Sequence, residues 1–156
     1  MADKDPHGPN SFSNYFEVHQ RVMRDCVTRG FVLSDNVVAI ALGNGNLLME
    51  GPIECLGDID ITIEKILEVT GQAKRRSIRT VEYHYNAHVR GLGNILRYDS
   101  PHPDHNQFHH AHRFDVFNGD RDGQVSKCEW PHIGAVIGEV EQWYYDNRDC
   151  LPQPQT

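Results

Sequence analysis

The chain of 156 residues lacks the long apolar runs and the leader segment that would send it into or across a membrane. No apolar run approaches the roughly 18 residues that a spanning helix needs. The first ten residues, MADKDPHGPN, contain no apolar stretch of the kind found in secretory signal peptides. The sequence therefore predicts a cytoplasmic protein with no membrane partner.

Cysteine is scarce and scattered. The four cysteines, Cys26, Cys55, Cys128 and Cys150, include no C-x-x-C pair. This spacing argues against a zinc site built on thiolates and against a disulfide framework, so we expect buried free thiols. Strong positive charge is also missing. The net charge of −7 argues against broad, non-specific nucleic-acid binding, but it leaves room for a local basic patch around a catalytic groove.

What is present fits one globular domain. Hydrophobic residues at 38% and charged residues at 24% are ordinary for a folded chain of this length. Polar, proline-containing ends predict disorder over 1–10 and 148–156, and the segment between them, 11–147, predicts a single domain. No internal repeat interrupts it.

Periodicity predicts the elements of that domain. Apolar residues at three- and four-residue steps predict helices over about 11–28, with Ser11 or Ser13 as N-cap and Gly30 beyond the end, and over about 131–146. Alternating or short apolar segments predict strands at 37–42, 47–51, 58–69, 77–91, 95–99 and 108–117. The expected fold is α+β: a meandering antiparallel sheet of about five to six strands flanked by an N-terminal and a C-terminal helix.

Histidines gather in the segment ILRYDSPHPDHNQFHHAHRF, residues 95–114. Five of the chain's ten histidines lie there: His102, His105, His109, His110 and His112. Three interpretations compete. The histidines form a metal-free acid–base site, or they bind a divalent metal, with His110 and His112 on one strand face and His102, His105 and Asp99 completing the sphere. In the third, they belong to a polar loop without chemistry.

A pair of imidazoles suits RNA cleavage without metal. One removes the 2′-hydroxyl proton, a second protonates the leaving 5′-oxygen, and an arginine stabilises the charged phosphorane. Arg97 and Arg113 flank the cluster, and Tyr98 could stack a base or donate a proton. The neighbouring strand carries more polar groups on one face, which would line the same groove if the strands pair in sequence order: His84, His88 and Arg90.

Residues 118–129, NGDRDGQVSKCE, also match the twelve-residue EF-hand loop. The ligand positions are filled by Asn118, Asp120, Asp122, Gln124, Ser126 and Glu129, with Gly123 at the sharp turn. Two features oppose a calcium site: the first position is Asn, and the incoming segment is rich in histidines and β-formers. The alternative is a hairpin turn, because Asp and Gly accept its backbone angles.

The strand Tyr83-His84-Tyr85, the run ILRYDS (95–100), the Pro/His loop and HHAH (109–112) together resemble the TumE family of toxin–antitoxin toxins. The resemblance covers about residues 35–117. Carried over by position, it implies a site made of Arg97, Tyr98, Asp99, His102, His109, His110 and His112. This chain departs from the family in Ser100, where Asn is usual, in a shorter loop and in an extended end.

The resemblance implies a growth-inhibiting toxin that is neutralised by a helix-turn-helix antitoxin. Combined with the histidine chemistry, it predicts a toxin-like protein acting on RNA, a metal-independent endoribonuclease without cofactors. The predicted catalytic residues are His110, His112, Asp99, Tyr98, His102 and His109, and the predicted substrate-binding residues are Arg97, Arg113, His84, His88 and Arg90. The alternatives are a divalent metal at the histidines, a calcium-binding module at 118–129, or a non-catalytic interaction domain. A homodimer also stays open.

Overall fold

In the computed structural model, residues 8–101 and 108–153 are described. Two α-helices lie within these ranges, α1 (Phe12–Arg29) and α2 (Ile133–Asn147). The strands are β1 (Asn10–Ser11), β2 (Val32–Asp35), β3 (Val38–Ala41), β4 (Asn46–Cys55), β5 (Ile59–Thr70), β6 (Ser77–Val89), β7 (Gly93–Asp99), β8 (His110–Arg113) and β9 (Gln124–Lys127). Short 3-10 helices occupy Leu56–Asp58, Ala73–Arg75, Val116–Asn118 and Arg148–Cys150.

All the strands of the described residues join one antiparallel sheet, in the order β2-β4-β5-β6-β7-β8-β9. From β4 to β9 the spatial order follows the chain, which is a meander; β1 pairs with β6 and β3 pairs with β4. The predicted α+β fold, an antiparallel sheet with one helix at each end of the chain, is confirmed. The sheet has nine strands rather than five or six, because β1, β2 and β9 have only two to four residues and show no readable period.

Helix α1 begins and ends where its capping residues predict. The side chain of Ser11 accepts a hydrogen bond from the N–H of Asn14, and Gly30 closes the helix in the left-handed conformation. Its buried residues are Tyr15, His19, Met23 and Cys26, one stripe along the helix. Helix α2 begins slightly later than predicted. Its N-cap is His132, whose Nδ1 accepts the N–H of Ala135, so Pro131 lies just outside the helix.

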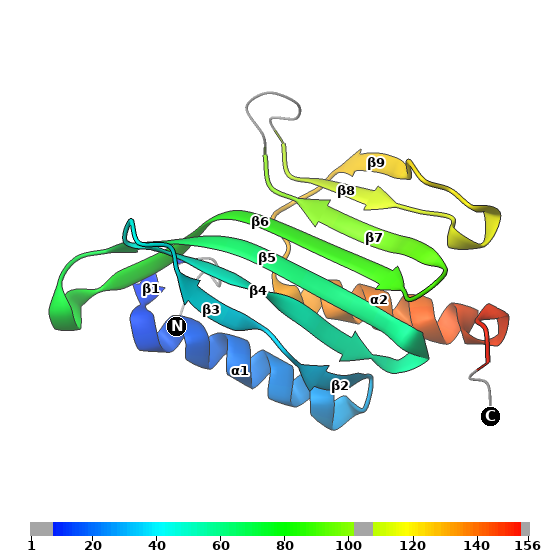
Figure 1. Cartoon of the computed structure of the whole chain (residues 1–156), viewed down its shortest axis with the longest axis horizontal. Helices are drawn as coiled ribbons and strands as arrows, with labels where there is room; N and C mark the ends of the chain where they lie inside the picture. The colour runs from blue at the N-terminus through cyan, green and yellow to red at the C-terminus, as the bar shows by residue number, and fades with distance from the viewer. Residues whose placement is uncertain (1–7, 102–107, 154–156) are drawn as a thin grey trace.

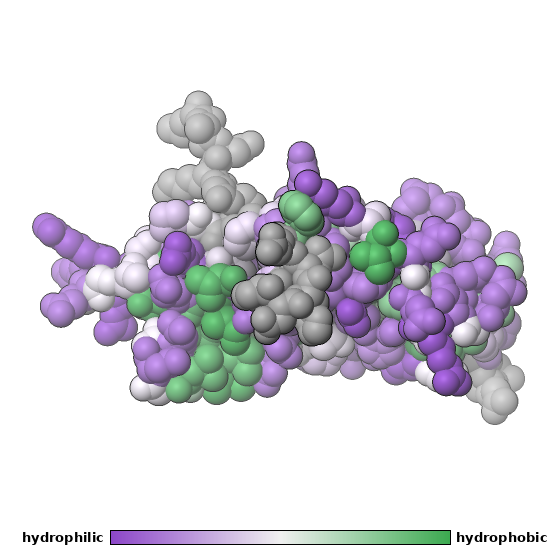
Figure 2. Space-filling view, turned by 90° about the horizontal axis from the view of Figure 1, so that it is seen from above, coloured by the Kyte–Doolittle hydropathy of each residue, from purple (hydrophilic) through white to green (hydrophobic). Residues whose placement is uncertain are grey.

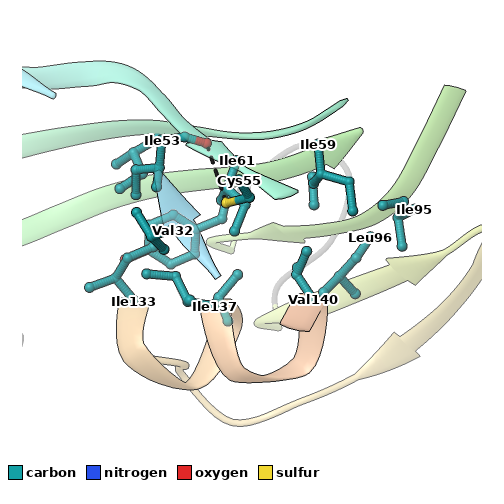
Figure 3. Close-up of a cluster of buried hydrophobic side chains, with 14 of the residues drawn as sticks. Val32, Ile53, Cys55, Ile59, Ile61, Ile95, Leu96, Ile133, Ile137 and Val140 are labelled. Carbon is teal, nitrogen blue, oxygen red and sulfur yellow. Dashed lines mark hydrogen bonds between the residues drawn. The ribbon is translucent and has the colours of Figure 1, made fainter. Parts of the chain in front are cut away.

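Both helices cover the same face of the sheet (Figure 1). On that face, β5 contributes a row of fully buried side chains, Ile59, Ile61 and Ile63. Figure 3 shows Ile137 and Val140 of α2 pointing toward this part of the sheet. Complete burial of one such aliphatic side chain contributes about 1.5–3 kcal/mol, so this layer is the main source of stability.

The opposite face of the sheet carries polar side chains. In β6, Tyr83, Tyr85 and Ala87 point into the core while His84 and Asn86 point to the other side, as the alternating sequence predicts. The register between β5 and β6 shifts at Ile66/Leu67, which marks a bulge. Central strands therefore display a row of ionisable groups on the face that the helices do not cover.

The ends and edges of the sheet have features that periodicity does not give. Gly51 of β4 has φ +144°, and a Cβ there would lie 2.3 Å from the carbonyl oxygen of Asn36, so only glycine fits where the chain passes from β2 to β3. Edge strand β3 exposes all four of its residues. Seen from above, the surface is mostly hydrophilic, with hydrophobic surface gathered toward the left of the view (Figure 2).

The structure extends beyond the predicted domain limits. Asn10, expected in a disordered end, is buried and pairs with Ile78, and Leu151 is buried against the core after the last 3-10 turn. These two side chains are held because the sheet and α2 offer partners that lie far away in the sequence. Cys26 and Cys55 are buried free thiols as expected, whereas Cys150 is exposed.

Candidate functional site

Three neighbouring strands place five ionisable side chains together on the face that the helices leave uncovered. His84 of β6 pairs with Asp99 of β7, and Asp99 pairs in turn with His110 of β8. Arg97 of β7 pairs with His112 of β8. Side chains directly opposite each other on one sheet face have Cβ atoms about 5 Å apart. We call these residues, His84, Arg97, Asp99, His110 and His112, the Asp99 cluster.

The carboxylate of Asp99 is the centre of this cluster. Its Oδ1 lies 2.8 Å from Nδ1 of His84, and its Oδ2 lies 2.8 Å from Nε of Arg97. The Nε2 atoms of His110 and His112 are each 3.4 Å from the same Oδ2. Burial alone would raise the pKa of Asp99, but the hydrogen bond from His84 and the charge of Arg97 outweigh it and hold the pKa below its usual value. Asp99 is therefore ionised at neutral pH.

His110 is arranged to donate protons. Its Nδ1 lies 3.0 Å from the carbonyl oxygen of Phe108, and its Nε2 faces the Asp99 carboxylate. Both of these oxygens only accept hydrogen bonds, so both ring nitrogens of His110 face acceptors.

His112, unlike His110, has a hydrogen-bond donor beside its ring. Its Nε2 lies 3.3 Å from a guanidinium nitrogen of Arg97, which can only donate, and 3.4 Å from Oδ2 of Asp99; in the neutral ring with its proton on Nδ1, this Nε2 accepts from Arg97. Burial and the charge of Arg97 lower the pKa of His112, and the neighbouring Asp99 carboxylate opposes the change only in part. The imidazole is therefore neutral at pH 7 and carries its lone pair in the cluster. The ring centroids of His110 and His112 lie 5.1 Å apart, and their side chains are 8% and 15% exposed.

Glu82 contacts the Asp99 cluster but is not among the predicted site residues. Its Oε1 lies 3.4 Å from Nε2 of His84, so both ring nitrogens of His84 face a carboxylate oxygen. The signal was available, because Glu82 and His84 are two residues apart on one strand and so share a face. Exposure differs across the cluster: the side chain of Asp99 is 5% exposed, whereas those of His84 and Arg97 are 31% and 43% exposed. A ligand can therefore reach the outer members.

The metal interpretation has a geometric basis. Ligand atoms of Asp99, His110 and His112 all lie within 4.8 Å of one another, and no other group of this kind is found in the described part of the chain. Arg97, however, donates to the same Oδ2 of Asp99 and reaches Nε2 of His112. A divalent cation would have to displace a permanently charged guanidinium from both ligand atoms. The residues offer three ligands, but the electrostatics favour the site without a metal.

Two predicted site residues lie on the other face of the sheet. The hydroxyl of Tyr98 donates to Glu139 of α2, and Arg113 bonds the same carboxylate at 2.9 Å and the Tyr98 hydroxyl at 3.2 Å. Burial, followed by the bond to Glu139, raises the pKa of Tyr98. This triad joins β7 and β8 to α2, so the structure does not bring Tyr98 or Arg113 to the Asp99 cluster.

The remaining predicted histidines and Arg90 separate in space. His109 stacks on Trp130 with ring centroids 5.1 Å apart and bonds the hydroxyl of Tyr83 at 2.7 Å; burial, followed by the charge of His110, lowers the pKa of His109. His88, farther along β6, and Arg90, just after the end of that strand, approach Asp60. The predicted members His102 and His105 lie outside the described residues.

The segment 118–129 has the hairpin arrangement, one of the two alternatives for it. It contains β9 and the turn before it, and β9 pairs antiparallel with β8, whereas an EF-hand loop lies between two helices. The carboxylate of Asp120 accepts hydrogen bonds from the backbone N–H groups of Asp115, Asp122 and Gly123, which lower its pKa. These bonds direct its oxygens to the turn. The acidic ligands of the motif do not converge among the described residues.

Comparison of the chain with protein-family models, with curated proteins and with solved structures returns no match. A search of the described helices for a membrane span also finds none that is long and apolar enough.

Proposed function

We propose that this chain is a toxin-like endoribonuclease that cleaves RNA at the Asp99 cluster without a metal. The observation that carries the proposal is one ionised carboxylate, Asp99, contacted by an arginine and three histidines on a sheet face that the helices leave uncovered. Two of these histidines differ in protonation chemistry, which is what acid–base catalysis needs.

His112 acts as the base and His110 as the acid. Nε2 of His112 takes the proton of a ribose 2′-hydroxyl, and the 2′-oxygen attacks the adjacent phosphorus. The bond from phosphorus to the 5′-oxygen breaks, and His110 gives that oxygen a proton. The products are a 2′,3′-cyclic phosphate and a free 5′-hydroxyl. The neutral His112 and the doubly accepting surroundings of His110 fit these two roles.

Arg97 and Asp99 support the chemistry electrostatically. The guanidinium of Arg97 is 43% exposed and lies beside His112, so it can donate to the non-bridging oxygens of the phosphate as charge builds on them. Asp99 fixes the rings of His84 and His110 and stabilises the imidazolium form that each catalytic cycle creates.

The resemblance to the TumE family supports the toxin part of the proposal and a helix-turn-helix antitoxin as partner. At position 100, where that family usually has Asn, the hydroxyl of Ser100 accepts the backbone N–H of Tyr83 at 3.2 Å. An Asn side-chain oxygen can accept the same bond. The departure from the family pattern is thus compatible with the Asp99 cluster.

Cleavage of a mixed RNA by the purified chain, with and without EDTA, tests the proposal. We expect cleavage that survives EDTA, yields 2′,3′-cyclic phosphate ends and is lost in a His110→Ala/His112→Ala double variant. A substrate with 2′-O-methyl groups should stay intact, because it has no proton for His112 to remove.

Arginine variants provide a matched control. Arg97→Gln should slow cleavage strongly, whereas Arg79→Gln, which removes an exposed arginine paired with Glu68 near the β5–β6 turn, should not. Thermal melts confirm that each variant is folded. Cleavage that disappears in EDTA would make Asp99, His110 and His112 metal ligands instead. No cleavage in either condition, with intact folding, would refute an RNA-cleaving site.

A further inference from the structure

Lys65 is a buried cation on the opposite face of the sheet from the Asp99 cluster. It lies on β5 and is 6% exposed. Among the described residues no carboxylate pairs with its ammonium, which instead lies 5.7 and 5.6 Å from the ring centroids of Tyr15 and Tyr85. A buried lysine is rare unless it is paired, because removing its charge from water is costly. The buried ammonium of Lys65 therefore lacks a negative partner in the described part of the chain.

Next to Lys65 lies a small cavity between the sheet and the two helices. Its volume is about 40 Å³. This is the space open to the centre of a water-sized sphere, and about 10–15 Å³ of such space is enough to hold one water molecule. The cavity is lined by Lys65, by Tyr15, Val18 and His19 of α1, and by His132 and Ile133 where α2 begins. The cavity thus has room for a small ion or for a few water molecules.

Several groups around the cavity favour a negative occupant. The first turn of the 15-residue helix α2 borders it, and the N-terminus of a helix carries a partial positive charge and unpaired N–H groups. His19 bonds Asp35 through Nε2 at 3.1 Å, while its buried Nδ1 has no hydrogen-bond partner among the described residues and can donate to an anion when the ring is protonated.

From this geometry we infer that the cavity binds one small inorganic anion, of the size of chloride or nitrate, between Lys65 and the N-terminus of α2. The anion supplies the negative partner that Lys65 lacks and links β5 to both helices. The site is separate from the Asp99 cluster and acts on the stability of the helix-covered side of the sheet.

Thermal unfolding at constant ionic strength tests this inference. Sodium gluconate is replaced stepwise by sodium chloride, sodium nitrate or sodium sulfate at pH 7. We expect the Tm of the wild-type chain to rise by several degrees and to saturate with chloride and with nitrate, because a ligand that binds only the folded state stabilises it. Sulfate should act without saturation, through exclusion from the protein surface.

Two lysine variants give the matched control. Lys65→Met, which keeps the side-chain length but removes the charge, should lose the saturable response, while the exposed Lys74→Met should retain it. As a direct measure of binding, the chloride-35 NMR line should broaden with the wild-type chain and with Lys74→Met but not with Lys65→Met. Equal responses of wild type and Lys65→Met, or no saturable response of the wild type, would overturn the inference. A water molecule would then occupy the cavity.

Discussion

Removing the charge of Lys65 should stabilise the protein, and the structure gives the size of the effect. Burial lowers the pKa of Lys65 from 10.5 to about 8. At about 1.4 kcal/mol for each pH unit, this difference corresponds to about 3 kcal/mol of unfavourable free energy at pH 7. Cation–π attraction to the two tyrosine rings beside the ammonium offsets part of this unfavourable free energy, on the order of 1 kcal/mol. In a gluconate buffer we therefore expect Lys65→Met to raise the free energy of unfolding by about 2 kcal/mol.

The pH dependence has a definite sign. Between pH 8 and 10.5 the unfolded chain keeps a proton on Lys65 that the folded chain has released. The unfolded state then binds more protons, so the wild type becomes more stable as pH rises, relative to a variant that lacks this group. The advantage of Lys65→Met is largest below pH 8 and shrinks by roughly half by pH 9.5.

Urea unfolding of the wild type, Lys65→Met and Lys74→Met at several pH values between about 6.5 and 9.5 measures both effects. The exposed Lys74→Met should match the wild type throughout. A Lys65→Met variant that is less stable than the wild type at pH 7 would refute the reasoning, since it would mean that the ammonium has a strong stabilising partner. So would a stability difference that does not change with pH.

Three further predictions concern other parts of the sheet. Because the pKa of His112 is lowered, the acidic limb of the pH–rate profile for RNA cleavage should lie below the usual histidine value of about 6.5. His112→Ala should reduce the cleavage rate about 10²–10⁴-fold. Calcium up to millimolar concentration should leave the fluorescence of Trp130 unchanged; a saturable shift that Glu129→Gln abolishes would contradict the hairpin interpretation. Tyr98→Phe removes the hydroxyl that donates to the partly exposed carboxylate of Glu139 and should lower the free energy of unfolding, measured in urea, by about 1–3 kcal/mol; a neutral substitution would show that the bond contributes nothing.

Local patterns in the sequence predicted much of this architecture. The caps of α1, the alternation of β5 and β6 and the hairpin between β3 and β4 follow from rules that act within a few residues. The same alternation predicted that His84 would lie on the polar face of its strand and that His110 and His112 would share one face of theirs. It also distinguishes Tyr98 from Asp99, because adjacent residues of a strand face opposite sides, so assigning both to one site conflicted with the period of the strand.

The sequence by itself determined the α+β class, the order of the meander and the residue types that could form a site, because period and capping are local properties. Only the tertiary structure decided which side chains meet. The cross-strand register joins Asp99 to His84 and to His110, and the packing of α2 draws Arg113 away to Glu139. Lys65 shows the same limit: its sequence neighbours predict an ordinary strand, but two helices distant in the sequence bury its charge. Burial and register depend on contacts between segments far apart in the chain. Local sequence patterns therefore do not predict either of them.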